Sequence, residues 1–186
     1  RANDTRTMVA CMVPYVAFSN KLPLILNDGR LPWRRFCCLL GNLNSLVYDF
    51  TARQKVGGAN LNFFIVEQIP TLPPDRYDDP CPWSKRTKLQ DWIAERVLKL
   101  TCTSEDMVPL AEAAEFPEKI HKWKDDERAK LRAELDAAYF ILYGINRDDV
   151  EYILGTFPGI SKEEELLGGG SQTRVLIMDA CDRLSG

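Results

Sequence analysis

Apolar residues recur at helical spacing between residues 32 and 56. Counted from Phe36, they lie three, four, seven, eleven and fourteen residues further on, at Leu39, Leu40, Leu43, Val47 and Phe50. This spacing places them on one face of an α-helix. Pro32 suits the first helical position, and Gly57 and Gly58 predict the end, because glycine adopts the left-handed conformation after a helix without a Cβ clash. The pattern predicts one continuous central helix.

Polar residues follow the opposite face of this predicted helix. Asn42, Asp49 and Arg53 lie seven, fourteen and eighteen residues after Arg35. At 100 degrees per residue these offsets are close to whole numbers of turns. We therefore expect the four side chains to share one exposed strip.

The segments around the central helix have the composition of short strands. Residues 7–18 are apolar and rich in valine, with Pro14 as a bulge or an end, and residues 63–69 are rich in aromatic and β-branched residues. Residues 20–26 predict a short extended element before a turn at residues 27–29. The N-terminal half should thus combine the central helix with a small, partial sheet.

The C-terminal half predicts helices. Starts are expected at Ser84, at Thr103 or Ser104, near Asp125, at Asn146 and at Ser171, and ends near residues 100, 144, 154 and 184. Residues 155–170 contain Pro158, an acidic triplet and the three consecutive glycines at 168–170, which predicts a mobile loop. The fold class predicted for the whole chain is α+β, mainly helical.

The distribution of charge also separates the N-terminal half from the C-terminal half, at about residue 74. Residues 1–74 contain eight Lys or Arg and four Asp or Glu, whereas residues 75–186 contain sixteen and twenty-three. A basic part can contact phosphates while an acidic part remains in solvent. We therefore predict two parts, residues 1–74 and 75–186, with a Pro- and Asp-rich linker at residues 71–83.

An ordered motif covers the end of the central helix and the segment after it. It reads N-L-N-S-x-x-x-D-F-x-A-R-Q-K-V-G-G, then N-L-N-F-F-I, and closes with L-P-P. This motif resembles the target-recognition region of the large fused adenine-specific DNA methyltransferases of restriction-modification systems, the type IIG-like enzymes. Residues 123–157 are similar to the C-terminal helical segment of the same enzymes.

The resemblance implies a DNA-recognition fragment of a bacterial, cytoplasmic enzyme. Its partners would be double-stranded DNA and the catalytic methyltransferase domain of the same parent chain, which would bind S-adenosylmethionine and methylate adenine N6. A nuclease fused to the parent is left open. Asn can bind adenine and Arg guanine through two hydrogen bonds, and glycine permits close approach to phosphate. The candidate DNA-binding residues are Arg34, Arg35, Asn42, Arg53, Lys55, Gly57, Gly58, Asn60 and Asn62.

No constellation predicts catalysis, a cofactor or a metal in this chain itself. The string from Asp79 to Trp83, D-P-C-P-W, is one residue longer than the Asn-Pro-Pro-aromatic turn of adenine methyltransferases, and no glycine-rich loop precedes it. The six cysteines form no C-x-x-C pair and His121 is the single histidine, so buried, reduced thiols are expected rather than a zinc site. No apolar run approaches the roughly 20 residues that span a bilayer.

Each candidate also has a structural interpretation. The polar strip can be a solvated helix face, and the glycines and asparagines can serve a turn. The alternative function is a structural helical module that braces the catalytic domain or binds a partner subunit without contacting DNA. The two differ in where Arg34, Arg35, Arg53 and Lys55 point. Because the chain begins at Arg1, with its first methionine at Met8, we expect a piece of a longer protein.

Overall fold

The computed structural model describes residues 5–16, 23–58, 60–166, 168 and 170–186, and within them the chain is a mainly helical α+β fold. The elements before residue 80 are α1 (Trp33–Asn44), α2 (Leu46–Lys55), α3 (Phe63–Val66) and the 3-10 helix η1 (Pro74–Asp78). A hairpin of β1 (Pro80–Cys81) and β2 (Ser84–Lys88) leads into α4 (Leu89–Thr101). The rest are η2 (Glu105–Met107), α5 (Val108–Ala113), α6 (Asp125–Leu142), α7 (Arg147–Gly155), α8 (Pro158–Leu166) and α9 (Gln172–Ser185).

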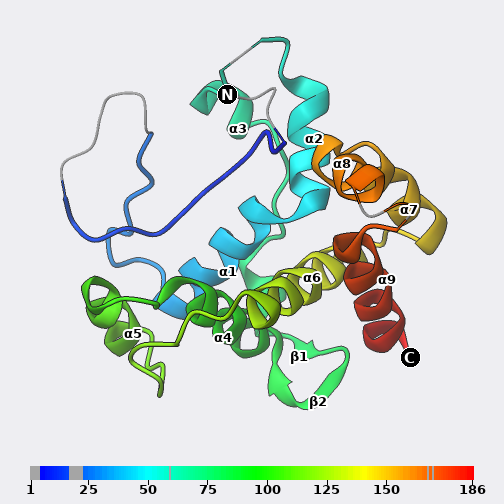
Figure 1. Ribbon diagram of the computed structural model, residues 1–186. Helices are drawn as coiled ribbons and strands as arrows, with labels where there is room; N and C mark the ends of the chain where they lie inside the picture. The colour runs from blue at the N-terminus through cyan, green and yellow to red at the C-terminus, as the bar shows by residue number, and fades with distance from the viewer. Residues whose placement is uncertain (1–4, 17–22, 59, 167, 169) are drawn as a thin grey trace.

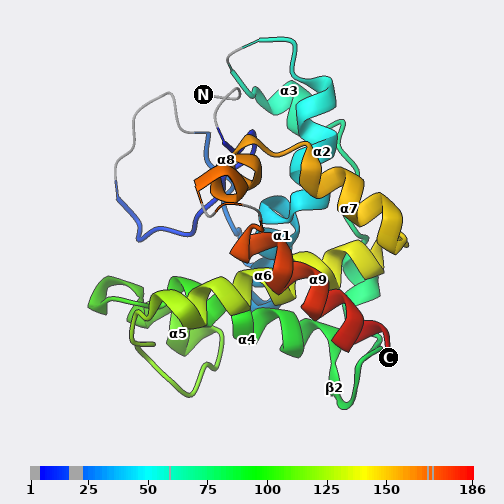
Figure 2. The ribbon, with the colours of Figure 1, turned by 45° about the vertical axis from the view of Figure 1, so that its right-hand side comes forward.

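Helix α6 lies at the centre of the packing. Figures 1 and 2 show α6 between α4 and α9, while α1 crosses α4 and α2 reaches toward α7. The main core draws buried residues from α1, α2, α4, α6, α7 and α9, so it contains side chains from both sides of residue 74. A second, small cluster joins Met8, Leu43, Tyr48, Ala52 and Ile69. The predicted division near residue 74 thus passes through one shared hydrophobic core.

The central helix is two helices rather than one. Ser45 has an extended backbone, with φ −68° and ψ 148°, and separates α1 from α2. Its hydroxyl donates to the carbonyl oxygen of Asn42 at 2.7 Å and accepts from the N–H of Tyr48 at 3.4 Å. A serine that caps a new helix competes with continuation of the old one. The spacing of apolar residues did not predict this break, because buried apolar residues continue at helical spacing from α1 into α2.

The strands expected in the N-terminal half are absent from its described residues. Residues 7–16 form no strand, and residues 63–66 form the helix α3. Residues 23–26 are irregular, while residues 17, 18 and 20–22 of the expected elements lie outside the described part. The small sheet is instead the antiparallel hairpin β1–β2, in which Cys81 pairs with Ser84, inside and just after the expected linker. Valine and aromatic residues favour strands because they pack well on a pleated surface, and this preference alone does not fix the backbone conformation.

Helix ends in the C-terminal half follow the local capping signals. The predictions of α6, α7 and α9 are confirmed: Gly144 has φ +71° just after α6, and Asn146 and Ser171 accept the capping N–H groups of Asp149 and Arg174. The start predicted at Ser84 is wrong, because β2 occupies residues 84–88 and α4 begins at Leu89. The loop expected at residues 155–170 is also wrong, since α8 occupies most of it.

Candidate functional site

The first half of the motif builds the junction between α1 and α2. Asn42 is fully buried at the end of α1, where its Nδ2 donates to the hydroxyl of Tyr143 at 3.0 Å. Its Oδ1 accepts from the N–H of Leu72 at 2.9 Å, and the Tyr143 hydroxyl donates to the carbonyl oxygen of Pro70 at 3.0 Å. Asn42 therefore ties α1 to the chain after α3 and to the end of α6. The prediction that it lies on an exposed strip is wrong.

Asp49 is the second buried member of the predicted strip. Its carboxylate accepts the N–H groups of Thr7 and Met8 at 2.9 and 3.0 Å and pairs with the guanidinium of Arg6. The side chain is fully buried, and a buried charge needs such partners to offset the loss of water. Asp49 anchors the N-terminal segment and is not available to a ligand.

Asn44 binds the same N-terminal segment at Ala10, two residues after Met8. Its side-chain amide accepts the N–H of Ala10 at 3.0 Å and donates to the carbonyl oxygen of Ala10 at 2.9 Å. It also donates to the carbonyl oxygen of Leu40, one turn earlier in α1. Asn44 is not among the candidates predicted from the sequence, although its place in the ordered N-L-N-S string was the available signal.

Asp136 of α6 completes the junction from the other side. Its Oδ1 accepts the N–H of Leu46, the first residue of α2, at 2.7 Å. Burial raises the pKa of Asp136 to about 6, with the carboxylate of Asp49 adding to the rise and the charge of Arg6 and the Leu46 hydrogen bond opposing it. A carboxyl at a helix N-terminus is placed to complement the helix dipole.

Arg34 faces the helical half of the chain. Its guanidinium donates to the carbonyl oxygens of Ala114 and Glu115 at 2.9 and 3.0 Å and pairs with Asp91 of α4 at 3.1 Å. The first two contacts lie next to the end of α5. Arg34 thus links α1 to α4 and α5.

Arg35 also binds other parts of the chain, on the neighbouring face of α1. It donates to the carbonyl oxygen of Pro74 and pairs with Asp78, both at 2.5 Å, and its Nε lies 3.4 Å from Gln90 Oε1. Only 13% of its side chain is exposed. The guanidinium therefore connects α1 with η1 and α4.

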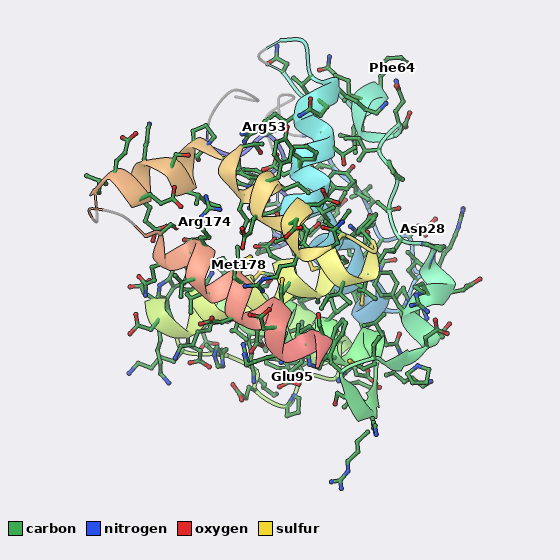
Figure 3. All side chains as sticks on the ribbon, turned by 90° about the vertical axis from the view of Figure 1, so that its right-hand side faces the viewer. Asp28, Arg53, Phe64, Glu95, Arg174 and Met178 are labelled. Carbon is green, nitrogen blue, oxygen red and sulfur yellow. The ribbon has the colours of Figure 1, made fainter. Side chains whose placement is uncertain are left out.

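Arg53 lies where α2 faces the chain between α7 and α8 (Figure 3). It donates to the carbonyl oxygens of Thr156 and Thr5 at 3.0 and 3.1 Å, and its guanidinium lies 4.5 Å from the centre of the Phe157 ring. Three of the four basic candidates, Arg34, Arg35 and Arg53, therefore bind other parts of this chain. The expected shared, exposed basic face does not form.

The second half of the motif is exposed. Lys55, Gly57, Gly58, Asn60 and Asn62 lie in or beside the connection from α2 to α3. A Cβ added to either glycine would meet no atom within 4 Å, and neither glycine has a positive φ. Helix α2 instead ends with Val56 in an extended conformation, so the left-handed ending predicted at the glycines is wrong. These residues remain accessible to a partner.

Two phenylalanines extend this exposed region, which is named here the α2–α3 loop (residues 55–58 and 60–64). Phe63 and Phe64 begin α3 and are 44% and 74% exposed, and Phe64 lies at the outer edge of the molecule in Figure 3. Asn62 precedes them, and its side chain makes no capping hydrogen bond to α3. The aromatic composition predicted a strand here, so the phenylalanines are not among the sequence candidates.

The D-P-C-P-W string is part of the hairpin. Cys81 in β1 is buried, and Trp83 at the turn packs edge-on against Trp92 of α4 with 5.1 Å between ring centres. The carbonyl oxygen of Asp79 accepts the N–H of Leu89 at 3.0 Å. The segment joins η1 to α4 as packed structure.

The cysteines are spread through the fold as free thiols. Cys37, Cys38, Cys81, Cys102 and Cys181 are buried, and Cys11 is exposed. Burial raises the pKa of Cys37 to about 12 and that of Cys102 to about 11, so these buried thiols stay protonated at neutral pH. In the part of the chain that the structure describes, no group of three or more His, Cys, Asp or Glu side chains is arranged to hold a metal ion.

Helix length and apolar character bear on membrane insertion. Among the described residues, no helix is both long enough and apolar enough to cross a membrane.

In comparisons with known proteins, the chain matches no protein-family model, and searches of curated proteins and of solved structures found no significant match.

Proposed function

We propose that this chain is a non-catalytic structural module of a type IIG-like fused adenine-specific DNA methyltransferase, and that its helices brace the catalytic part of that enzyme. The assignment to these enzymes rests on the motif resemblance. S-adenosylmethionine binding and adenine methylation would belong to the rest of the parent enzyme.

One observation argues against DNA contact by most of the motif and so favours the structural role. Every charged or amide side chain singled out between residues 34 and 53 is bound within the chain, and Asn42 and Asp49 are fully buried. A side chain that reads a base edge or neutralises a phosphate must present its donors outward. The motif residues instead hold α1, α2, α6 and the N-terminal segment together.

The exposed α2–α3 loop supports DNA contact as a second candidate function. It presents the amides of Asn60 and Asn62, the ammonium of Lys55 and a backbone without Cβ atoms at Gly57 and Gly58. Amide side chains can pair with adenine, and exposed aromatic rings can stack on bases. The loop offers a single cation, so the electrostatic part of such binding is weak.

The test separates the two roles with two matched asparagine variants. Asn42→Ala removes partners from Leu72 N–H and the Tyr143 hydroxyl, so we expect it to lower the free energy of unfolding by about 1 to 3 kcal/mol. Asn62→Ala changes an exposed side chain without a capping bond, and should stay within about 0.5 kcal/mol of wild type. Urea unfolding followed by circular dichroism measures both.

Duplex binding, followed by fluorescence anisotropy at several salt concentrations, supplies the second readout. If the chain is a brace, the four basic candidates contribute no more than about −1 to the slope of log K against log salt, because Arg34, Arg35 and Arg53 are engaged within the chain and leave Lys55 for phosphate. A slope near −4 that falls on Arg34→Gln or Arg35→Gln would overturn the bracing role. Loss of sequence preference in Asn62→Ala alone would establish the α2–α3 loop as the DNA contact.

A further inference from the structure

The N-terminal segment has the burial pattern of a strand. From Met8 to Val13 exposure alternates: Met8 is buried, Ala10 and Met12 pack against the body, and Val9 and Val13 are 74% and 43% exposed. Figure 1 shows the segment as an extended trace that runs along the body away from α2. A period of two places one set of side chains on the body and the other outward.

The backbone of this segment is paired along one edge only. Asn44 binds both the N–H and the carbonyl of Ala10, and Asp49 binds the N–H of Met8. In an extended chain the backbone groups of successive residues point to opposite edges, so those of Val9 and Cys11 face away from Asn44. Within the described residues these groups have no hydrogen-bond partner. Asn44 thus acts as a strand partner on the inner edge and leaves the outer edge open.

The outward side chains favour a sheet as the occupant of that edge. Val9, Val13, Tyr15 and Val16 are exposed, and β-branched and aromatic residues pack well on a pleated surface. Pro14 lacks an N–H and limits the ladder to residues 8–13, about 20 Å of strand. Two copies joined through this short segment alone would make only a two-stranded ribbon, which is marginal in water. A preformed sheet supplies more contact.

We propose that residues 8–13 add as a strand to the exposed edge of a preformed β-sheet in a partner domain or protein, through the backbone groups of Val9 and Cys11. Such strand addition derives affinity from main-chain hydrogen bonds and selectivity from alternate side chains. The partner's edge strand would present apolar residues toward Val9 and Val13. This interaction does not depend on the methyltransferase assignment.

Cys11 allows a direct test with a probe strand. It is exposed in the middle of the open edge, whereas the other five thiols are buried. The probe is a short peptide with a central cysteine, valines two residues to either side and threonines between, offered in a glutathione redox buffer. The disulfide holds this single strand at the open edge, so a two-stranded pairing that is marginal on its own becomes measurable. The control peptide is N-methylated at the cysteine and both valines, which removes the backbone donors of one edge. Mass spectrometry measures the mixed disulfide at Cys11.

We expect the unmodified peptide to form the mixed disulfide with an equilibrium constant on the order of tenfold larger than the methylated one. Val9→Pro removes an outward N–H and should abolish this preference while leaving the melting temperature unchanged, because that N–H binds nothing in the described chain. Val9→Thr keeps the N–H and should keep the preference.

Two results would overturn the proposal. The first is equal tethering of both peptides. The second is a concentration-dependent dimer in sedimentation experiments that slows maleimide labelling of Cys11, since this would make a second copy the occupant. Should Val9→Pro fail to fold, amide exchange of Val9 and Cys11 in the tethered wild-type protein replaces that variant. Exchange as fast as in the untethered chain then also counts against strand addition.

Discussion

Among the single residues, Asp136 gives the clearest test, because the fold raises the pKa of its carboxyl into a range that is easily studied. It receives the first N–H of α2 from a position in the second half of α6, so it couples the two helices directly. Its pKa is raised to about 6 mainly because burial disfavours the charged form. The neutral carboxyl is therefore favoured in the folded chain relative to the unfolded chain.

This coupling predicts a pH-dependent stability. Because the folded pKa is raised above the unfolded value of 3.8, the contribution of Asp136 is fully present below pH 3.8 and is lost as pH rises through about 6. From about pH 4 to about pH 8, the free energy of unfolding of wild type should fall relative to Asp136→Asn by about 2 to 3 kcal/mol. Urea unfolding of both proteins at each pH measures the difference.

Asp179→Asn, an exposed carboxyl on α9, serves as the control for Asp136→Asn. Its stability should track that of wild type across the same pH range. A wild-type minus Asp136→Asn difference that is flat, or that grows with pH, would mean that the carboxyl is stabilised as an anion at the α2 N-terminus.

At the scale of elements, the crossing of α1 with α4 and α6 depends on one small residue. Gly41 is buried in α1, and a Cβ built on it would lie 3.0 Å from the Tyr139 hydroxyl and 3.3 Å from Val97 Cγ2. The Tyr139 hydroxyl is held in place because it donates to the carbonyl oxygen of Cys38 at 2.7 Å. Because this position lacks a side chain, Tyr139 of α6 and Val97 of α4 can pack directly against the backbone of α1.

Gly41→Ala should therefore destabilise the chain even though alanine is the better helix former. Overpacking of a well-filled core costs about 1 to 3 kcal/mol, against a gain of about 1 kcal/mol in helix propensity. Gly155→Ala, at the end of α7, meets only the end of the Arg174 side chain, at an ordinary contact distance of 4.0 Å, and should be stabilising by up to about 1 kcal/mol. Thermal melts of the two variants should shift in opposite directions; equal upward shifts would show that the crossing has room for a methyl group.

For the whole molecule, the structure predicts a definite order of local stability. Helix α8 is held by buried Ile160, by Glu163 accepting from Ser171 at 2.5 Å, and by the pair of Glu164 with Arg174 at 2.6 Å. We expect its amides to exchange with solvent more slowly than those of the exposed α2–α3 loop, and those of α6 and α9 to exchange slowest. Hydrogen exchange followed by mass spectrometry measures this order. Exchange in α8 as fast as in the loop would show that residues 155–170 are mobile, as the sequence predicted.

The sequence by itself determined the mainly helical class and the ends of α6, α7 and α9, because Gly144, Asn146 and Ser171 act on backbone groups within one turn of themselves. Only the tertiary structure decided which polar residues are free. Arg35, Asn42, Asp49 and Arg53 share a helix face by periodicity, but the partners that bury or bind them come from residues 30 to 103 positions away. It also decided that the valine-rich segment is held by Asn44 rather than by a strand. Periodicity records where side chains point on one element, and it carries no information about which distant groups meet them.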